Sequence, residues 1–332
     1  MLRVVLTGAT GYVGQAILDQ LALLPAGTVA VRALVKKDKV FPPRDFVEVI
    51  EGNLPDLPGN LFFEEPHLLI HFGIKQVDFL KTGFYETNVL GTHNLLQGCN
   101  GNTLGVIYGS TLSIQGSRSN VGVVESELVQ PETALERSRA QAEQLIIETM
   151  SRDDKWAFCL RPRFILGPSD SLLMKGLILL SRLGVRVGNG DQQYSVITVE
   201  DYAQVVVKLS RKIAVEKQDV TADNHDSITE QPIRCALNVA YKRPVSFQQM
   251  FSEIRSVKGI NNRVKTLPLP VWLPGLIKWI PHTIAESAAT QLQSIGFNHC
   301  CDVSALEQLL GDDITQLDGV EKLKRLLQQE EA

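Results

Sequence analysis

Cysteine, aromatic residues and excess charge of either sign are all scarce in this chain of 332 residues. Its five cysteines form an odd, dispersed set without a C-x-x-C pair, which indicates free thiols in a reducing compartment and excludes a small disulfide scaffold. Lysine and arginine number 33 against 37 acidic residues, so the net charge is −4. Such a balance argues against nucleic acid or an anionic membrane as the main partner, because both are negatively charged and bind best to a protein with an excess of positive charge.

Two further absences concern metals and membranes. The six histidines lack the spacing of metal ligands, so we expect no metal site. No stretch reaches the roughly 18 consecutive apolar residues of a membrane span, and a strand expected from Leu2 leaves no room for a signal peptide. We therefore expect a cytoplasmic protein without a transmembrane segment.

The chain does contain apolar strand-like runs that alternate with helical patterns. This alternation predicts βαβ units and an α/β fold, with a Rossmann-type doubly wound parallel sheet in 1–166. Shorter strands, prolines and helices in 167–332 predict a smaller C-terminal lobe that binds the substrate and interleaves with the first domain. The expected strands of the first domain are 2–6, 29–35, 46–50, 67–72, 105–108 and 156–160, and its helices are 15–24, 84–99 and 131–150.

Three glycines at a spacing of three residues lie between the first expected strand and the first expected helix. This arrangement permits a tight turn, a close approach of the backbone to a pyrophosphate, and free N–H groups at a helix start. A turn that serves packing alone is the alternative, but the place in the first βα unit favours dinucleotide binding. The predicted cofactor contacts in this loop are Gly8, Thr10, Gly11, Tyr12, Val13 and Gly14.

Two lysines follow the second expected strand, where an acidic residue usually holds the ribose 2′-hydroxyl of NAD. Lys36 and Lys37 suit a 2′-phosphate instead, so we predict that NADP(H) is the preferred cofactor and that NAD(H) is possible. A solvated pair of surface charges is the alternative, and Asp38 would serve an NAD ribose if the strand ran longer.

Further motifs occur along nearly the whole chain. They are GNL at 52–54, IHFG at 70–73, NVLGTHNLL at 88–96, LRP at 160–162 with GP at 167–168, VEDYA at 199–203, NVA at 238–240 and CDVS at 301–304. Together with TGATGYVG at 7–14, they make the sequence similar to the extended short-chain dehydrogenase/reductase superfamily, in particular its NAD-dependent epimerase/dehydratase and 3β-hydroxysteroid dehydrogenase branches. The resemblance implies further cofactor contacts at Asn53, Leu54, Phe72, Gly73, Lys75, Asn88 and Pro162.

The chain departs from this family in its chemistry. Family members carry a Ser or Thr after the fifth strand, matched here by Thr111, and a Y-x-x-x-K motif whose tyrosine is the general acid/base. Leu135 stands in place of that tyrosine and Arg139 in place of the lysine. Leucine cannot move a proton, whereas arginine keeps the charge that holds ribose hydroxyls but is no acid at neutral pH. The predicted catalytic residues are Thr111, Ser113 and Arg139.

Three functions fit this pattern. The first is an atypical NADP-dependent, ketoreductase-like enzyme in which Thr111 and Ser113 polarise a carbonyl, and Arg137 or Arg163 steadies the negative charge that develops. The apolar segment 267–281 favours a hydrophobic or polycyclic small molecule as its substrate. The second is a non-catalytic NAD(P)-binding regulatory or scaffold protein. The third is a sugar-nucleotide epimerase or dehydratase, although those reactions also rely on the missing tyrosine.

One partner is implied by the resemblance alone. The helix expected at 131–150 corresponds to the helix through which many relatives form a two-fold interface, so a homodimer through this helix is predicted. A surface helix without a partner would show the same pattern.

Overall fold

The computed structural model describes residues 1–78, 83–116, 119–168, 172–218, 231–260, 267–270 and 295–329. The chain divides into two compact units. The first consists of Met1–Ile114, Pro131–Arg161 and Glu200–Leu237, and the second of Gln115–Gln130, Pro162–Val199 and Asn238–Ala332. Each unit takes segments from both sides of residue 166, and the domain boundary placed there from the sequence stays a prediction.

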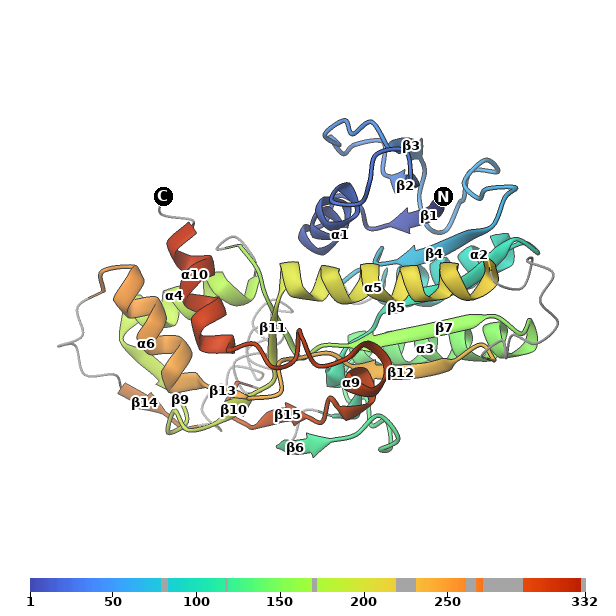
Figure 1. Ribbon diagram of the computed structural model, residues 1–332. Coiled ribbons are helices and arrows are strands. Elements are labelled where there is room, and N and C mark those ends of the chain that lie inside the picture. Colours follow the sequence, from blue (N-terminus) through green and yellow to red (C-terminus); the bar gives the residue numbers. More distant parts are fainter. Residues whose placement is uncertain are drawn as a thin grey trace. The chain divides into compact units, whose positions relative to one another are not determined.

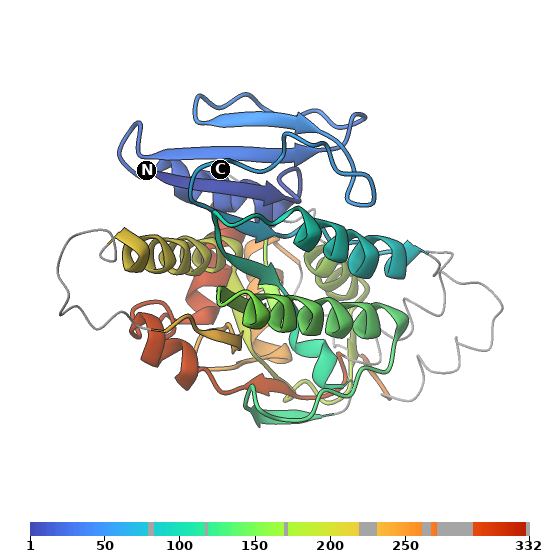
Figure 2. The same cartoon turned by 90° about the vertical axis from the view of Figure 1, so that its right-hand side faces the viewer.

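A seven-stranded sheet forms the centre of the first unit, in the order β12-β7-β5-β4-β1-β2-β3. Neighbouring strands from β3 to β7 pair in parallel, and Figure 2 shows the blue strands β1, β2 and β3 side by side. The prediction of a Rossmann-type parallel sheet is confirmed. The strands are β1 (Leu2–Thr7), β2 (Val29–Val35), β3 (Val47–Glu51), β4 (His67–His71), β5 (Thr103–Gly109), β7 (Trp156–Arg161) and β12 (Arg234–Asn238).

Helices accompany this sheet within the first unit. Helix α3 packs beside α2 and against β5 and β7 (Figure 1), and it starts at a capping box in which Thr133 and Glu136 each accept the other's backbone N–H. Side chains between α3 and the sheet, among them Tyr108, Ile146 and Met150, form an apolar core. The helices are α1 (Tyr12–Ala22), the π-helix η1 (Tyr85–Leu90), α2 (Gly91–Gly98), the 3-10 helix η2 (Leu112–Gln115), α3 (Ala134–Arg152) and α5 (Val199–Gln218).

The second unit contains a four-stranded sheet in the order β13-β10-β15-β6 and two two-stranded sheets, β11-β8 and β14-β9. Helix α6 packs against α4 and α10. The strands are β6 (Asn120–Val123), β8 (Phe164–Leu166), β9 (Val185–Val187), β10 (Gln193–Tyr194), β11 (Val196–Thr198), β13 (Val245–Ser246), β14 (Leu267–Leu269) and β15 (His299–Cys301). The helices are α4 (Leu172–Leu183), α6 (Phe247–Val257), α9 (Ser304–Leu310) and α10 (Gly319–Gln329).

Two sequence expectations concern apolar segments. Of segment 267–281, the structure describes 267–270, so the remainder lies outside the described residues. Among the helices of the described ranges, none combines the length and the apolar character that crossing a membrane requires.

Candidate active site

Glycine is required twice in the loop between β1 and α1. Gly8 has a positive φ of 77°, and a Cβ atom at this residue would lie 2.4 Å from the backbone carbonyl of Phe72. A Cβ atom on Gly14 would lie 2.2 Å from the carbonyl oxygen of Gly8. The absence of these two side chains therefore lets the loop, the start of α1 and the end of β4 approach one another closely.

The start of α1 offers donors for an anion. Gly11 is the N-cap residue and contributes no side-chain cap, and the N–H groups of the first turn, from Tyr12 to Gly14, have no partner within the helix. Thr10, Gly11 and Tyr12 are exposed. Exposed backbone N–H groups at a helix start above a glycine turn fit the pyrophosphate of a dinucleotide.

The connection after β2 carries several cations. Strand β2 ends at Val35, so Lys36 and Lys37 follow it directly, and both are exposed. Arg44, in the same connection, donates to Gln15 Oε1 at 3.0 Å and lies 2.8 Å from an Asp19 carboxylate oxygen, so it is held against α1. Sequence reasoning missed Arg44, because it follows two prolines and belongs to no motif.

A buried hydrogen-bond chain joins the ends of β1 and β4 to α2. Thr7 accepts the N–H of Gly73 at 3.0 Å and donates to His71 Nδ1 at 2.7 Å. Thr92 donates to the Asn88 carbonyl oxygen at 2.6 Å, so it accepts from His71 Nε2 at 2.9 Å. Burial, with the charge of Arg139 as a second cause, lowers the pKa of His71 to about 3, and the ring is neutral.

The residues after β3 and β4 that were predicted as cofactor contacts mainly make contacts within the protein, next to this hydrogen-bond chain. The Asn88 amide accepts the Lys75 N–H at 2.8 Å and donates to the Lys75 carbonyl oxygen and to Ser138 Oγ, so it fastens this segment to α3. Leu54 is buried, and its Cδ1 would lie 3.2 Å from a Cβ atom on Gly73. Asn53 makes a bridge to Asp56, and Lys75 Nζ lies 3.3 Å from an Asp78 carboxylate oxygen.

Hydroxyl groups follow the end of β5. Thr111 Oγ1 lies 3.2 Å from Ser113 Oγ and accepts the Ser113 N–H at 3.2 Å. Ser110 donates to Glu143 on α3 at 2.6 Å, and Glu143 forms a buried ion pair with Arg161 at the end of β7. This network ties the turn that carries Thr111 to α3 and β7.

Arg139 points from α3 to the end of β5. Its side chain is buried, one amino group donates to the Gly109 carbonyl oxygen, and its Nε has no hydrogen-bond partner among the described residues. Its guanidinium carbon lies 5.8 Å from the centre of the Tyr108 ring. Leu135, one turn earlier, is half-buried, so the structure keeps the cation at this place but has no proton donor at 135.

Two buried tyrosines near Arg139 were missed as site residues. The hydroxyls of Tyr108 and Tyr202 are buried without a hydrogen-bond partner in the described ranges. Burial raises the pKa of Tyr108 to about 12 and also raises that of Tyr202, and in both cases the charge of Arg139 opposes the shift. The sequence placed Tyr202 in the VEDYA motif, but only the fold shows which side chains surround it.

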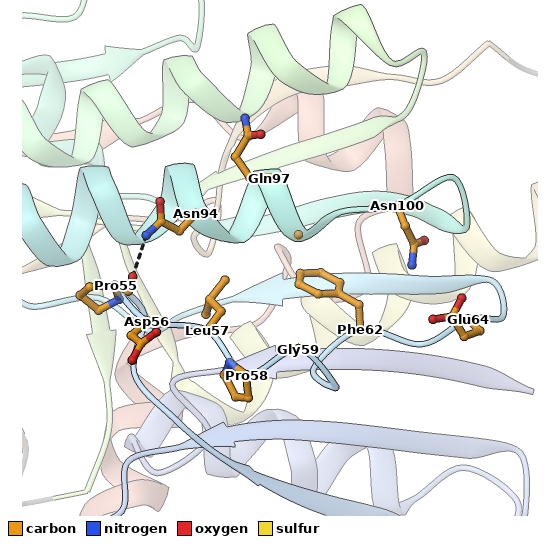
Figure 3. Close-up of a pocket in the computed structure, with 11 residues that line it drawn as sticks. Pro55, Asp56, Leu57, Pro58, Gly59, Phe62, Glu64, Asn94, Gln97 and Asn100 are labelled. Carbon is orange, nitrogen blue, oxygen red and sulfur yellow. Dashed lines mark hydrogen bonds between the residues drawn. The ribbon is translucent and has the colours of Figure 1, made fainter.

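The remaining predicted residue, Pro162, is buried in the second unit. A cavity of about 450 Å³ lies elsewhere in the first unit, between the segment after β3 and α2 (Figure 3). No predicted site residue lines it. Two amides at its wall are paired within the protein, since Asn94 donates to the Pro55 carbonyl oxygen at 2.8 Å and Asn100 to that of Phe63 at 3.0 Å, and we assign the cavity no role.

Comparisons with known proteins identify the family and the fold of this chain. The model of the NAD dependent epimerase/dehydratase family matches residues 4–221. A 3beta-hydroxysteroid-dehydrogenase/decarboxylase, isoform 2, of Arabidopsis thaliana is 24% identical over 198 residues, which are 57% of this chain and 34% of that protein. The chain thus matches about a third of that relative's length.

Solved structures show the same fold across the whole chain. The UDP-glucuronic acid 4-epimerase of Bacillus cereus in complex with NAD is 15% identical, with a TM-score of 0.72 and coverage of 100% of both chains. The dTDP-glucose 4,6-dehydratase of Bacillus anthracis in complex with NAD is 13% identical, with a TM-score of 0.71 and coverage of 100% of this chain and 97% of that one.

Proposed function

This chain belongs to the NAD dependent epimerase/dehydratase family, and we propose that it is an NADP-dependent reductase of a hydrophobic carbonyl compound that works without the family's tyrosine. The observation that carries the proposal is the intact cofactor cradle beside a buried cation, Arg139, and a hydroxyl pair, Thr111 and Ser113. A role as a sugar-nucleotide epimerase gains less support, because the structural likeness at 13–15% identity concerns the fold.

The residues of the first unit fit a nicotinamide dinucleotide. The space kept open by Gly8 and Gly14, and the free N–H groups at the start of α1, suit its pyrophosphate. Arg139 has an unpaired buried Nε that suits the ribose next to the nicotinamide. When bound, the reduced nicotinamide supplies a hydride to the substrate.

The preference for NADP(H) rests on charge. Lys36 stands directly after β2 and is exposed, and the partly buried Arg44 adds a second cation in the same connection. An acidic side chain that would repel a 2′-phosphate is absent from position 36. We assign Lys36 the main contact with this phosphate.

The substrate end of the proposal depends on the hydroxyl pair. Thr111 and Ser113 are positioned by the Ser110–Glu143–Arg161 network at the end of β5, and their hydroxyls polarise the carbonyl oxygen. Hydride transfer needs the reacting atoms at close distance, and general acid catalysis adds typically 10²–10⁴-fold. The apolar sequence of 267–281 and the sterol enzyme among the relatives favour a polycyclic ketone. The proposal also includes a homodimer through α3.

The test compares the native protein with a variant in which the family's pair is restored, Leu135→Tyr with Arg139→Lys. We expect the native protein to oxidise NADPH in the presence of at least one member of a panel of aromatic and polycyclic ketones. If the native protein binds NADPH but reduces none of them, while the restored variant does, the reductase proposal is wrong and a non-catalytic NAD(P)-binding protein takes its place.

A further inference from the structure

Tyr202 carries a polar group that the folded chain does not satisfy. The side chain is 0% exposed, and its hydroxyl has no hydrogen-bond partner within the part of the chain that the structure describes. Two other buried tyrosines differ: Tyr194 donates to the Ile295 carbonyl oxygen, and Tyr241 both accepts from and donates to Thr198. A buried hydroxyl without a partner is costly, so its presence points to a partner that arrives with a ligand.

A continuous set of contacts places Tyr202 beside the predicted cofactor site. Its ring meets the Phe72 ring edge-on at 5.9 Å, and Phe72 directly follows β4. The Phe72 ring lies against Gly109, where a Cβ atom would be 2.6 Å from the ring. The Gly109 carbonyl oxygen accepts from Arg139. All these residues lie at the carboxyl edge of the parallel sheet, which is where such folds bind dinucleotides.

Position in the fold favours Tyr202 over Tyr108 as the functional hydroxyl, since the charge of Arg139 acts on both tyrosines. Tyr202 lies in the first turn of α5 and is within electrostatic reach of both Arg139 and Tyr12, the first residue of α1. Tyr108 instead lies in the apolar core between β5 and α3, and its ring centre lies 5.4 Å from that of His71, with the two rings tilted by 36°. Tyr202 is thus close enough to the cation that replaces the family's lysine for its charge to act on the hydroxyl.

We propose that the Tyr202 hydroxyl is the proton donor of this protein, in the role that the family gives to a tyrosine at position 135. The proposal rests on the reductase function. In the step, the carbonyl carbon receives a hydride from the reduced nicotinamide, the π electrons of the C=O bond move to the oxygen, and this oxygen takes the Tyr202 proton. The products are the alcohol, the oxidised cofactor and a tyrosinate at 202, which the Arg139 charge stabilises until a solvent proton restores it.

The protonation state agrees with this role. Burial raises the pKa of Tyr202, so the hydroxyl keeps its proton at neutral pH and is present as the acid. Arg139 lowers the pKa, which eases loss of the proton in the reaction. A bound oxidised cofactor, whose nicotinamide ring is positively charged, would lower the pKa of Tyr202 in the same direction as Arg139.

The first experiment needs no substrate. Tyr202→Phe removes an unpaired hydroxyl, so the melting temperature of the protein without cofactor should stay the same or rise. The matched control, Tyr241→Phe, removes a hydroxyl with two hydrogen bonds to Thr198 and should melt a few degrees lower. NADPH affinity by calorimetry should change less than threefold in Tyr202→Phe. A tenfold loss of affinity would make Tyr202 a cofactor ligand and overturn the proposal.

The second experiment follows tyrosinate absorbance near 295 nm during alkaline titration with saturating NADP⁺. The native protein should show one tyrosine that ionises at lower pH than in the cofactor-free protein, and this signal should vanish in Tyr202→Phe but persist in Tyr241→Phe. Titrations of the native protein and Tyr202→Phe that coincide would overturn the assignment even if no ketone is reduced.

The third experiment uses whichever ketone the native protein reduces. At saturating NADPH and ketone, Tyr202→Phe should slow turnover about 10²–10⁴-fold, whereas Tyr241→Phe should keep it within threefold. Unchanged turnover in Tyr202→Phe would contradict the proposal. If the native protein reduces none of the ketones, the proposed reductase function is wrong. The tyrosinate titration alone would then test whether Tyr202 lies beside the bound cofactor.

Discussion

At the scale of single residues, the proposed site keeps a cation where the family has a lysine but has no tyrosine at position 135. Arg139 retains the positive charge of the family's lysine, and Leu135 removes the tyrosine. The buried side chains of His71 and Tyr202 differ in their hydrogen bonds: the histidine has a partner on each nitrogen, and the tyrosine hydroxyl has none among the described residues. A satisfied group builds the structure, whereas an unsatisfied one is available to a ligand.

His71 makes the stability of the protein depend on pH. Its pKa is about 3 in the folded protein and about 6.5 when unfolded, so below pH 6.5 the unfolded state takes up a proton that the folded state does not. Stability is therefore lost as the pH falls from about 6.5 towards 3, by about 2 kcal/mol at pH 5 from this residue alone. Urea unfolding at pH 7 and pH 5 measures the loss.

The control for this prediction is His71→Gln, which should lose about 2 kcal/mol less than the native protein between the two pH values. His67, whose pKa burial also lowers, contributes equally to both proteins. The exposed His93, replaced by Gln, should reproduce the native loss. Equal losses in the native protein and His71→Gln would show that His71 is not held neutral by the fold.

Substitutions of Arg139 and of Thr111 should differ in their effects on cofactor binding and on turnover. Arg139→Ala removes a charge-assisted contact to the ribose and should weaken NADPH binding tenfold or more. It also removes the charge that lowers the pKa of Tyr202, so turnover at saturation should fall as well. Thr111→Val removes a donor to the carbonyl oxygen and should lower turnover about 10²-fold while NADPH affinity is kept. Calorimetry and steady-state kinetics on both variants give the two numbers. The reverse pattern would exchange the proposed roles.

At the scale of elements, the sequence predicts the sheet well. Strands buried on both faces are continuous apolar runs, and β2 (Val29–Val35) has the predicted limits, while β7 (Trp156–Arg161) extends one residue further. The helix expected at 84–99 instead begins as a π-helix, Tyr85–Leu90, and continues as α2. Periodicity does not show this wider turn.

The site was predictable where a motif is local. The glycine loop lies within eight residues, and its spacing together with its place in the first βα unit predicted dinucleotide binding. Tyr202 and Arg44 were missed, because their importance comes from neighbours that are distant in sequence: Tyr202 meets Phe72, and Arg44 meets Gln15. Buried hydroxyls without partners become visible only when the fold is known.

Lys36, directly after β2, should determine the preference for NADPH over NADH. Lys36→Ala should weaken NADPH binding about tenfold and leave NADH binding within twofold, because only NADPH carries the 2′-phosphate that the lysine neutralises. Lys324→Ala, an exposed lysine on α10, is the matched control and should change neither affinity. Calorimetry with both nucleotides is the measurement. Equal native affinities for NADPH and NADH would refute the proposed preference.

At the scale of the whole molecule, the cofactor proposal and the substrate proposal have different foundations. The first unit contains the glycine loop, Thr111, Arg139 and Tyr202, so the proposed reaction is argued from its geometry. The substrate class is argued from the apolar sequence of 267–281. Pro162 and this segment belong to the second unit.

If the protein forms the proposed homodimer through α3, its mass in solution should be twice that of one chain. The exposed polar side chains of this helix are Arg137, Gln141, Gln144, Glu148, Ser151 and Arg152, so the contact would be largely polar. Light scattering at micromolar concentration should give twice 36.7 kDa. Gln141→Arg should shift the protein towards the monomer by placing like charges across the two-fold axis. A native monomer at this concentration would refute the dimer.

Transfer of the hydride itself tests the central claim most directly. The protein is mixed in excess with NADPH that carries deuterium on both positions of the nicotinamide C4, together with the ketone panel, and the products are analysed by mass spectrometry. If this chain is a reductase despite Leu135, one deuterium atom appears on the carbinol carbon of at least one alcohol. If NADPH is bound but no alcohol carries deuterium, the protein binds its cofactor without using it, and the proposed reductase function is wrong.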